Sequence, residues 1–165
     1  MKIAVVSDTH GNWLPVKEAI EAAGGVDYLM FLGDHASDGR QLEKSLQIPA
    51  YIVRGNCDDF SDGLEEQLVE LDGWRFLLCH GHRYQVKDNL QRIYFRGLEQ
   101  QVDFVLFGHT HQFLYEEGDV TLLNPGSASR MNMVLNADSW VLLTLSAKKE
   151  KNFLKKYEKK ACQSY

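Results

Sequence analysis

YLMFLGDH, residues 28–35, is an apolar run that ends abruptly at a glycine, a carboxylate and an imidazole. An apolar run of this length bounded by glycine predicts a buried strand of a largely parallel sheet. Asp34 then lies at the carboxyl end of that strand, where loops converge in open α/β sheets and ligands bind. We therefore take Asp34 as the centre of a candidate site.

Four other short apolar runs end in the same way: residues 2–10 (KIAVVSDTH), 50–58 (AYIVRGNCD), 74–82 (WRFLLCHGH) and 102–111 (VDFVLFGHTH). The polar side chains at these ends are Asp8, His10, Asn56, His80, His109 and His111. All six histidines of the chain, which include His35 and His82, fall at strand ends and none on a predicted helix face. This coincidence favours a metal site over a structural polar cluster.

The types of donor indicate the kind of metal. Carboxylate and amide oxygens with several imidazoles and no thiolate favour Mn²⁺, Fe²⁺, Zn²⁺ or Co²⁺ over Ca²⁺. Seven donors are too many for one catalytic ion and suit two ions about 3.5–4 Å apart that share a carboxylate, for which we choose Asp34. Such a pair stabilises the attacking and leaving oxygens at phosphorus, and a water between the ions becomes hydroxide near neutral pH.

The first third of the chain alternates strands and helices. Residues 12–23 have a helical apolar face that ends at Gly24-Gly25. A second helix, capped by Ser37 or Asp38, is expected to precede a strand at residues 51–53. This order is typical of parallel strands covered by helices.

The later part of the chain favours hairpins. Asp72-Gly73 is a strong hairpin signal between two apolar runs, and residues 113–124 suggest a second hairpin. A helix is expected over residues 87–101 and strands over 102–107 and 139–145, whereas residues 152–157 fit a strand or a helix. Asn124, Pro125 and Gly126 are interpreted as a turn. Two stacked sheets with helices outside satisfy this order better than one open sheet.

Composition limits the possible classes of protein. A length of 165 residues predicts one domain, residues 1–165, and the N-terminus resembles neither a signal peptide nor a membrane span, which favours a cytoplasmic protein. Three cysteines without C-x-x-C spacing indicate neither a disulfide framework nor a zinc ribbon. Residues 148–165 carry a net charge of +5, whereas the whole chain carries −5. Residues 1–147 are therefore acidic, and no stable nucleic-acid complex is expected. The basic tail is either a lysine-rich solvated edge or a contact for anionic partners.

The motifs SDTHGN, LGDH, GNCD, CHGH and GHTH, followed by NPGS at residues 124–127, closely resemble those of the calcineurin-like metallophosphoesterases. The nearest branch is the small single-domain bacterial and archaeal phosphodiesterases, and the resemblance covers residues 1 to about 130. It implies an α/β fold, a four-layer α-β-β-α sandwich of two mixed sheets flanked by helices, with a dinuclear site at its edge.

Matched position by position, the resemblance assigns the metal ligands. The first ion would be held by Asp8, His10, Asp34 and His111. The second would be held by Asp34, Asn56, His80 and His109, with Asp34 bridging. The resemblance implies two divalent ions per chain, with Mn²⁺ as activator and Fe²⁺, Zn²⁺, Co²⁺ or Ni²⁺ as alternatives. It also implies a small phosphodiester substrate, no membrane partner, and a homodimer or homotetramer.

One position departs from the wider family. Its phosphatases read GNHE, with a histidine that protonates the leaving group, whereas this chain has Cys57 in GNCD. Asp34 and His109 are expected to be catalytic as well as metal-binding, and His82 is a candidate to orient or protonate substrate. The alternative for His82 is a hydrogen-bond partner of a metal ligand. Cys57 is either a reactive thiol or merely a small side chain.

Three functions follow from these residues and the resemblance. The leading hypothesis is a dinuclear phosphodiesterase acting on a small or activated phosphodiester. The runner-up is a non-catalytic protein-interaction scaffold, because the retromer scaffold subunit uses this fold to bind partners after losing part of the metal set. Here every ligand position is intact, which favours the enzyme. A phosphomonoesterase is a third possibility, disfavoured by Cys57.

Overall fold

The first sheet is centred on β1 (Lys2–Val6) in a computed structural model that describes residues 1–128, 139–146 and 155–161. On one side β1 pairs in parallel with β2 (Tyr28–Phe31), which pairs in parallel with β3 (Ala50–Ile52). On the other side the antiparallel strands β9 (Ser139–Leu145) and β10 (Lys155–Ala161) complete the order β10-β9-β1-β2-β3. The part of residues 152–157 that is described is thus a strand.

The second sheet has the order β4-β5-β6-β8-β7. Its strands are β4 (Glu66–Leu71), β5 (Trp74–Cys79), β6 (Phe104–Leu106), β7 (Phe113–Glu116) and β8 (Thr121–Pro125). The central strands β5, β6 and β8 are parallel, and the edge strands β4 and β7 are antiparallel to their neighbours. Both predicted hairpins are confirmed, and Asp72 and Gly73 have the positive φ values that their two-residue turn requires.

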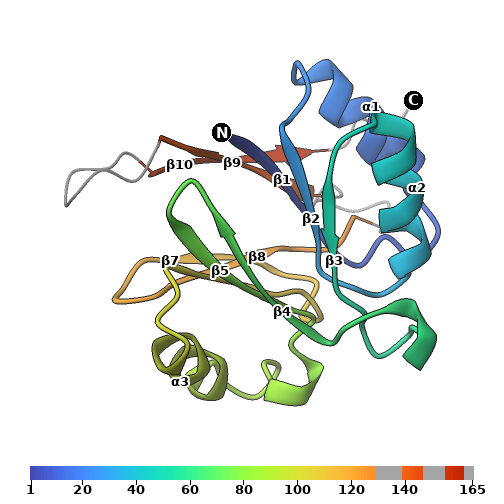
Figure 1. The fold of residues 1–165 in the computed structure, drawn as a ribbon. Coiled ribbons are helices and arrows are strands. Elements are labelled where there is room, and N and C mark those ends of the chain that lie inside the picture. The colour runs from blue at the N-terminus through green and yellow to red at the C-terminus, as the bar shows by residue number, and fades with distance from the viewer. Residues whose placement is uncertain (129–138, 147–154, 162–165) are drawn as a thin grey trace.

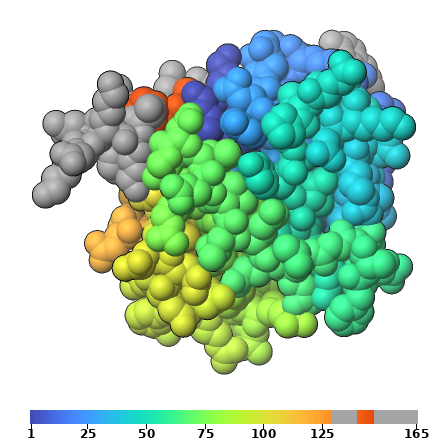
Figure 2. Space-filling view, viewed as in Figure 1, coloured from blue at the N-terminus to red at the C-terminus, as the bar shows by residue number. Residues whose placement is uncertain are grey.

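Alternation along the strands produces the layers seen in Figure 1. Inward-facing residues of both sheets, such as Val5 and Phe76, form one buried cluster between the sheets. The opposite face of the first sheet is covered by α1 (Leu14–Ala22) and α2 (Ala36–Leu46), and that of the second sheet by α3 (Gln91–Glu99). The α/β fold is therefore the expected four-layer α-β-β-α sandwich. In the space-filling view the blue-to-teal and green-to-yellow parts of the chain meet along a continuous boundary (Figure 2).

Two helix boundaries differ from the sequence prediction. The helix expected over residues 87–101 begins only at Gln91, because the Asn89 side chain accepts the Gln91 N–H and residues 85–90 stay a loop. The expected cap of α2 was wrong: the helix follows His35, which has a φ of 72° and no side-chain cap. Asp38 lies inside the first turn of α2, and its carboxylate accepts hydrogen bonds from the loop of residues 9–11.

The turn expected at residues 124–126 begins inside a strand. Asn124 and Pro125 are the last residues of β8, and Asn124 Oδ1 accepts the Gly126 N–H at 2.9 Å, which closes an Asx turn at Gly126, where φ is 85°. Of the helices in the described residues, none is both long and apolar enough to cross a membrane.

Candidate metal centre

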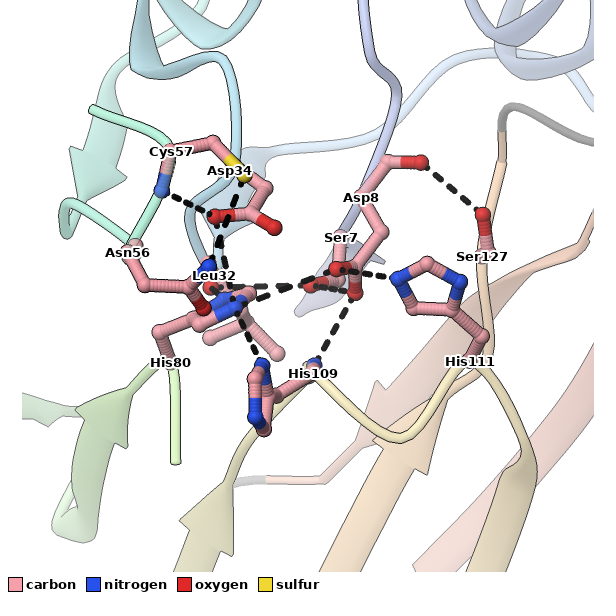
Figure 3. A network of polar contacts seen from close by, with 12 residues as sticks. Ser7, Asp8, Leu32, Asp34, Asn56, Cys57, His80, His109, His111 and Ser127 are labelled. Atoms are coloured by element: carbon pink, nitrogen blue, oxygen red, sulfur yellow. Dashed lines mark hydrogen bonds and ion pairs between the residues drawn. The ribbon is translucent and has the colours of Figure 1, made fainter. Parts of the chain in front are cut away.

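The predicted ligands gather at one edge of the two sheets (Figure 3). Asp8 follows β1 and Asp34 follows β2, while His80 directly follows β5 and His109 follows β6. Because β1 and β2 are parallel, as are β5 and β6, the strands of each pair end on the same side. In Figure 3 Asp8 lies between His111 on one side and His80 and His109 on the other.

Four donor side chains form a close cluster. Their donor atoms all lie within 4.8 Å of one another. They are Asp8, His10, Asp34 and His111. His111 Nε2 is 3.1 Å from Asp8 Oδ1, and His10 Nε2 is 3.9 Å from Asp34 Oδ2. This is the set expected to hold the first ion.

One oxygen of Asp8 makes the cluster a good cation site. Asp8 is fully buried, and its Oδ2 accepts hydrogen bonds from Ser7 Oγ at 2.6 Å and the His109 N–H at 3.1 Å. Its Oδ1 is buried and accepts no hydrogen bond among the described residues, and it faces His111 Nε2 at 3.1 Å. A buried carboxylate oxygen that accepts no hydrogen bond is costly, and a divalent cation bound by this oxygen and the imidazole would satisfy it. The residues present therefore fit a metal ion.

The second expected set surrounds His80. The buried His80 ring places Nδ1 2.7 Å from the Leu32 carbonyl, which can only accept, so Nδ1 carries the proton. His80 Nε2 lies 3.4 Å from Asp34 Oδ1 and 3.2 Å from His109 Nδ1, and it would offer its lone pair to a metal ion once the ring is neutral. Asn56 is exposed and its amide donates to Cys57 Sγ at 3.5 Å. The structure thus brings Asp34, His80 and His109 together, with Asn56 turned toward Cys57.

Electrostatics in the site follow from buried negative charge. Burial alone would raise the pKa of Asp34, but the His80 hydrogen bond and charge, with the Cys57 amide, outweigh it and hold that pKa well below its usual range. Burial lowers the pKa of His80, whereas Asp34 and Asp8 raise it above its ordinary value of 6.5. Burial and the positive charges of His80 and Lys87 lower the pKa of His109 to about 4. The His109 imidazole is therefore neutral at physiological pH and has a lone pair available for a metal ion.

The site loops share an uncommon backbone conformation. Ten non-glycine residues in the described ranges have positive φ, and six of them belong to this site. They are Asp8, His10, Asp34, His35, His109 and His111. Such residues are strained, and strain of this kind persists where surrounding contacts enforce it, commonly at functional sites.

Several residues that position the ligands were not recognised from the sequence as part of the site, although Asp38 was considered as a helix cap. Asp38 Oδ2 accepts hydrogen bonds from Thr9 Oγ1 at 2.6 Å and from the Gly11 N–H at 2.7 Å. Asp58 accepts the N–H groups of Gly55 and Ala36, each at 2.8 Å. Asp38 thus ties the loop that carries Asp8 and His10 to α2, and Asp58 ties the loop that carries Asn56 to α2.

Two residues of the NPGS segment act in the same way. Asn124 Nδ2 donates to the Gly108 carbonyl at 2.7 Å, and Ser127 Oγ donates to the Asp8 carbonyl at 2.9 Å. For Asp58, Asn124 and Ser127 the only available signal was membership of the quoted motifs GNCD and NPGS, and Asp38 lies in neither motif. No periodicity or spacing distinguishes these side chains from ordinary turn residues.

Comparison with known proteins identifies the family. Residues 1–148 match the calcineurin-like phosphoesterase superfamily domain. The chain belongs to this superfamily. This phosphoesterase is 32% identical over 150 residues to the "probable metallophosphoesterase YsnB" of Bacillus subtilis, covering 88% of this chain and 85% of the relative. It is also 32% identical over 144 residues to a phosphodiesterase of Methanocaldococcus jannaschii, covering 76% and 83%.

Solved structures agree with the fold of the phosphoesterase. A predicted phosphoesterase from Streptococcus pneumoniae superposes with a TM-score of 0.74 at 26% identity, covering 94% of this chain and 87% of that one. Vps29 of Entamoeba histolytica, crystallised with zinc, superposes with a TM-score of 0.75 at 20% identity, covering 99% and 100%. The second likeness shows the shared fold alone.

The spare imidazoles of the phosphoesterase flank the cluster. The His82 ring lies 5.6 Å from that of His80, and its buried Nδ1 has no hydrogen-bond partner among the described residues. Burial and the charge of His80 lower the pKa of His82, so the ring is neutral and suited to orient a group more than to donate a proton. On the other side the His35 ring lies 5.4 Å from that of His10.

Cys57 carries a protonated thiol, and two of the arginines near the motifs pair with Glu65. Burial, followed by the hydrogen bond and charge of Asp34, raises the pKa of Cys57 to about 11, so its thiol stays protonated at neutral pH. Arg54 is 7% exposed and its guanidinium pairs with Glu65, as does that of Arg83 at 2.5 Å. Arg130, a third arginine near a motif end, lies outside the described residues.

Proposed function

We propose that this phosphoesterase is a dinuclear metal-dependent phosphodiesterase that hydrolyses a small or activated phosphodiester. The observation that carries the proposal is the cluster around the buried Asp8 Oδ1, which accepts no hydrogen bond among the described residues, in a chain of a phosphoesterase superfamily. The similar phosphodiesterase of M. jannaschii supports a diester as substrate. Mn²⁺ is the proposed metal, and a homodimer or homotetramer the proposed assembly.

The residues divide into two proposed ligand sets with Asp34 shared. Asp8, His10, Asp34 and His111 would hold one ion, and Asp34, Asn56, His80 and His109 the other. Two such ions supply an activated water and stabilise charge on the phosphoryl oxygens. The Leu32 carbonyl keeps His80 in the tautomer that presents Nε2 to the site.

The chain's own side chains explain a preference for activated esters. Cys57 occupies the position where relatives of the wider family carry a proton-donating histidine, and its protonated thiol with a raised pKa is a poor acid. General acid catalysis typically contributes about 10²–10⁴-fold, so poor leaving groups should depart slowly. His82 is the proposed residue that orients the substrate, since its Nδ1 is otherwise unpartnered within the described part of the chain.

The test compares wild type with Asp34→Asn after removal of metal by a chelator. With Mn²⁺ restored, wild type should hydrolyse an aryl phosphodiester faster than the matching monoester. Asp34→Asn should lose at least about 10³-fold in kcat, because metal ions supply several kcal/mol of charge stabilisation. Asp119→Asn, an exposed carboxylate in the β7–β8 turn, is the matched control and should keep full activity.

Titration calorimetry with Mn²⁺ separates loss of metal from loss of folding. Absence of turnover on either ester with Mn²⁺, Fe²⁺, Zn²⁺ or Co²⁺, despite measured metal binding, would contradict the proposal. The fold likeness to Vps29 makes a protein-interaction scaffold the second candidate, and partner capture would then be the next experiment. A monoester rate above the diester rate would instead indicate a phosphomonoesterase.

A further inference from the structure

Glu65 pairs with two arginines that lie in different loops. Its Oε1 forms an ion pair with the guanidinium of Arg54, and its Oε2 lies 2.5 Å from Arg83 Nε. Arg54 follows β3 of the first sheet, whereas Arg83 belongs to the short 3₁₀ helix His82–Tyr84, which follows β5 of the second sheet. We call these three side chains the Glu65 bridge, because they connect the loop after β3 to the loop after β5.

The Glu65 bridge lies close in the chain to two ligands proposed for the second ion. Asn56 is two residues after Arg54, and His80 is three residues before Arg83. Asn56 therefore approaches the site from the first sheet and His80 from the second. The distance between these two side chains depends on how the loops after β3 and β5 are held against each other.

Arg54 is the buried end of the bridge. It is 7% exposed, its guanidinium carbon lies 4.3 Å from the centroid of the Phe60 ring, and its backbone N–H donates to the Leu64 carbonyl at 2.8 Å. The buried Arg54 charge needs the Glu65 carboxylate, because a buried charge that loses its partner is strongly destabilising. Glu65 is thereby held beside the loop that carries Asn56.

Arg83 is the exposed end of the bridge. Its side chain is 65% exposed, and its Nε is the atom that faces Glu65. An exposed ion pair adds little to the stability of a protein. The contact of Arg83 with Glu65 therefore bears more on the position of the loop after β5 than on folding.

The Asn56 side chain is bonded to a neighbour in the chain. It is exposed, and its amide donates to Cys57 Sγ at 3.5 Å. A bond to the next residue moves with the loop and does not fix the loop in place. The position of Asn56 therefore depends on the contacts of the loop after β3, which are those of Arg54 with Glu65 and of Gly55 with Asp58.

The ligands proposed for the first ion are held by other contacts. They follow β1, β2 and β6, so none of them lies in the loop after β3 or after β5. The loop of residues 9–11, which includes His10, is held by Asp38, and the Asp8 carbonyl is held by Ser127. Loss of the Glu65 bridge should therefore affect the two ions unequally.

We propose that Glu65 is a positioning residue for the second ion: through Arg54 and Arg83 it sets the distance between Asn56 and His80. The inference rests on the proposed dinuclear function and adds a residue outside both ligand sets that controls the second position. Without the Glu65 bridge the two loops separate more easily, and an ion that needs ligands from both loops binds more weakly.

Glu65→Gln tests the proposal with little change in shape. The amide oxygen still accepts a hydrogen bond from Arg54, but the negative charge and the second acceptor for Arg83 are lost. Wild type should bind two Mn²⁺ ions per chain in titration calorimetry and show the electron paramagnetic resonance signal of a coupled Mn²⁺ pair. In Glu65→Gln one ion should keep its Kd and the other should bind about 10–100-fold more weakly, the loss typical when a residue that orients a ligand is removed. The resonance signal should then be that of isolated Mn²⁺.

Arg83→Ala keeps the test decisive if Glu65→Gln folds poorly. It removes an exposed side chain and leaves the Arg54–Glu65 pair intact, so urea unfolding should match that of wild type. The same ion should bind about threefold more weakly, the effect of one partly exposed ion pair. Glu99→Gln is the matched control: Glu99 also pairs with an arginine, Arg96 at 2.7 Å, but lies on α3 outside the bridge. It should bind both ions as wild type does.

The outcomes separate this inference from the function on which it rests. Unchanged binding of both ions in Glu65→Gln and Arg83→Ala, or equal weakening of both ions, would overturn the positioning role alone. A wild-type chain that binds fewer than two Mn²⁺ ions would overturn the proposed dinuclear function and this inference together.

Discussion

Glycine immediately precedes three of the proposed ligands, and each of these glycines has a steric reason. A Cβ atom at Gly108 would lie 1.9 Å from Ser7 Oγ, and one at Gly55 would lie 2.2 Å from Asp34 Oδ1. At Gly33 it would lie 2.6 Å from the Gly55 nitrogen. At these positions the backbone of one loop packs directly against a side chain or the backbone of another loop, which leaves no room for a Cβ atom. This explains the glycine in the pairs Gly-Asp, Gly-Asn and Gly-His of the motifs.

At the residue scale, Gly108→Ala should weaken both folding and metal binding. The added methyl group collides with buried Ser7, which holds Asp8, so we expect a loss of about 1–3 kcal/mol in the free energy of unfolding. Displacing a residue that orients a ligand should reduce Mn²⁺ affinity by about 10–100-fold. Urea unfolding of the metal-free protein and titration calorimetry measure the two effects.

Gly118→Ala is the matched control for Gly108→Ala. Gly118 lies in the exposed β7–β8 turn, where the nearest atom to an added Cβ is 3.5 Å away, an ordinary contact. Its stability should stay within about 0.5 kcal/mol of wild type. Equal behaviour of the two variants would show that the close approach at Gly108 has no role in the site.

At the element scale, α2 connects two loops of the metal centre. Its first backbone N–H, that of Ala36, donates to Asp58, and a carboxylate at a helix N-terminus is favoured by the helix dipole. Asp38, in the first turn of the helix, holds the loop of residues 9–11. The helix that covers the first sheet thus also sets the relative positions of the loops that carry Asp8, His10 and Asn56.

The prediction for this element concerns Asp38→Ala. Asp38 is 6% exposed, and its removal leaves the Thr9 hydroxyl and the Gly11 N–H without their acceptor. The Thr9 hydroxyl is fully buried, and an unsatisfied buried donor costs about 1–3 kcal/mol, whereas the exposed Gly11 N–H can bond to water. The free energy of unfolding should therefore fall, and Mn²⁺ affinity should fall with it. Thermal unfolding and calorimetry provide the readouts. Asp119→Ala in the exposed turn should change neither, and an unchanged Mn²⁺ affinity in Asp38→Ala would exclude this role for α2.

At the scale of the whole molecule, the site depends on two sheets that contribute ligands from separate halves of the chain. Asp8 and Asp34 come from the first sheet, whereas His80 and His109 come from the second. The cluster between the sheets keeps the halves together and includes Phe76, whose ring stacks on Phe104 at 5.3 Å. The relative position of the two sheets therefore determines the distances between the donors.

Phe76→Ala tests this dependence on the core. Phe76 is fully buried, so its truncation should cost about 3–5 kcal/mol of the free energy of unfolding. Phe95→Ala is the matched control: Phe95 is 63% exposed on α3, and its loss should change stability by less than about 0.5 kcal/mol. Guanidinium unfolding measures both variants. Similar losses for the two would contradict the assignment of the core.

The predictions that held depend on residues close in sequence. Asp72-Gly73 specifies its hairpin because a two-residue turn needs positive φ at both positions. The candidate ligands, whose metal-binding role stays a prediction, lie at or shortly after the ends of apolar strands, and the family indicated by the motif set is confirmed. The predicted starts of α2 and α3 were wrong because of side-chain hydrogen bonds. Asn89 accepts the Gln91 N–H just before α3, and Asp38 accepts a hydrogen bond from Thr9 and does not cap α2.

The sequence by itself therefore determined the family, the layers and the set of candidate donor residues. Three features are seen only in the tertiary structure. They are the buried Asp8 oxygen that accepts no hydrogen bond among the described residues, the hydrogen bonds of Asp38 and Asp58 between loops and α2, and the ion pairs of Glu65 with Arg54 and Arg83. The physical reason is range. Strand periodicity and turn conformation are set by neighbouring residues, whereas a contact such as Ser127 to Asp8, 119 residues apart, forms only when the packed sheets bring distant loops together.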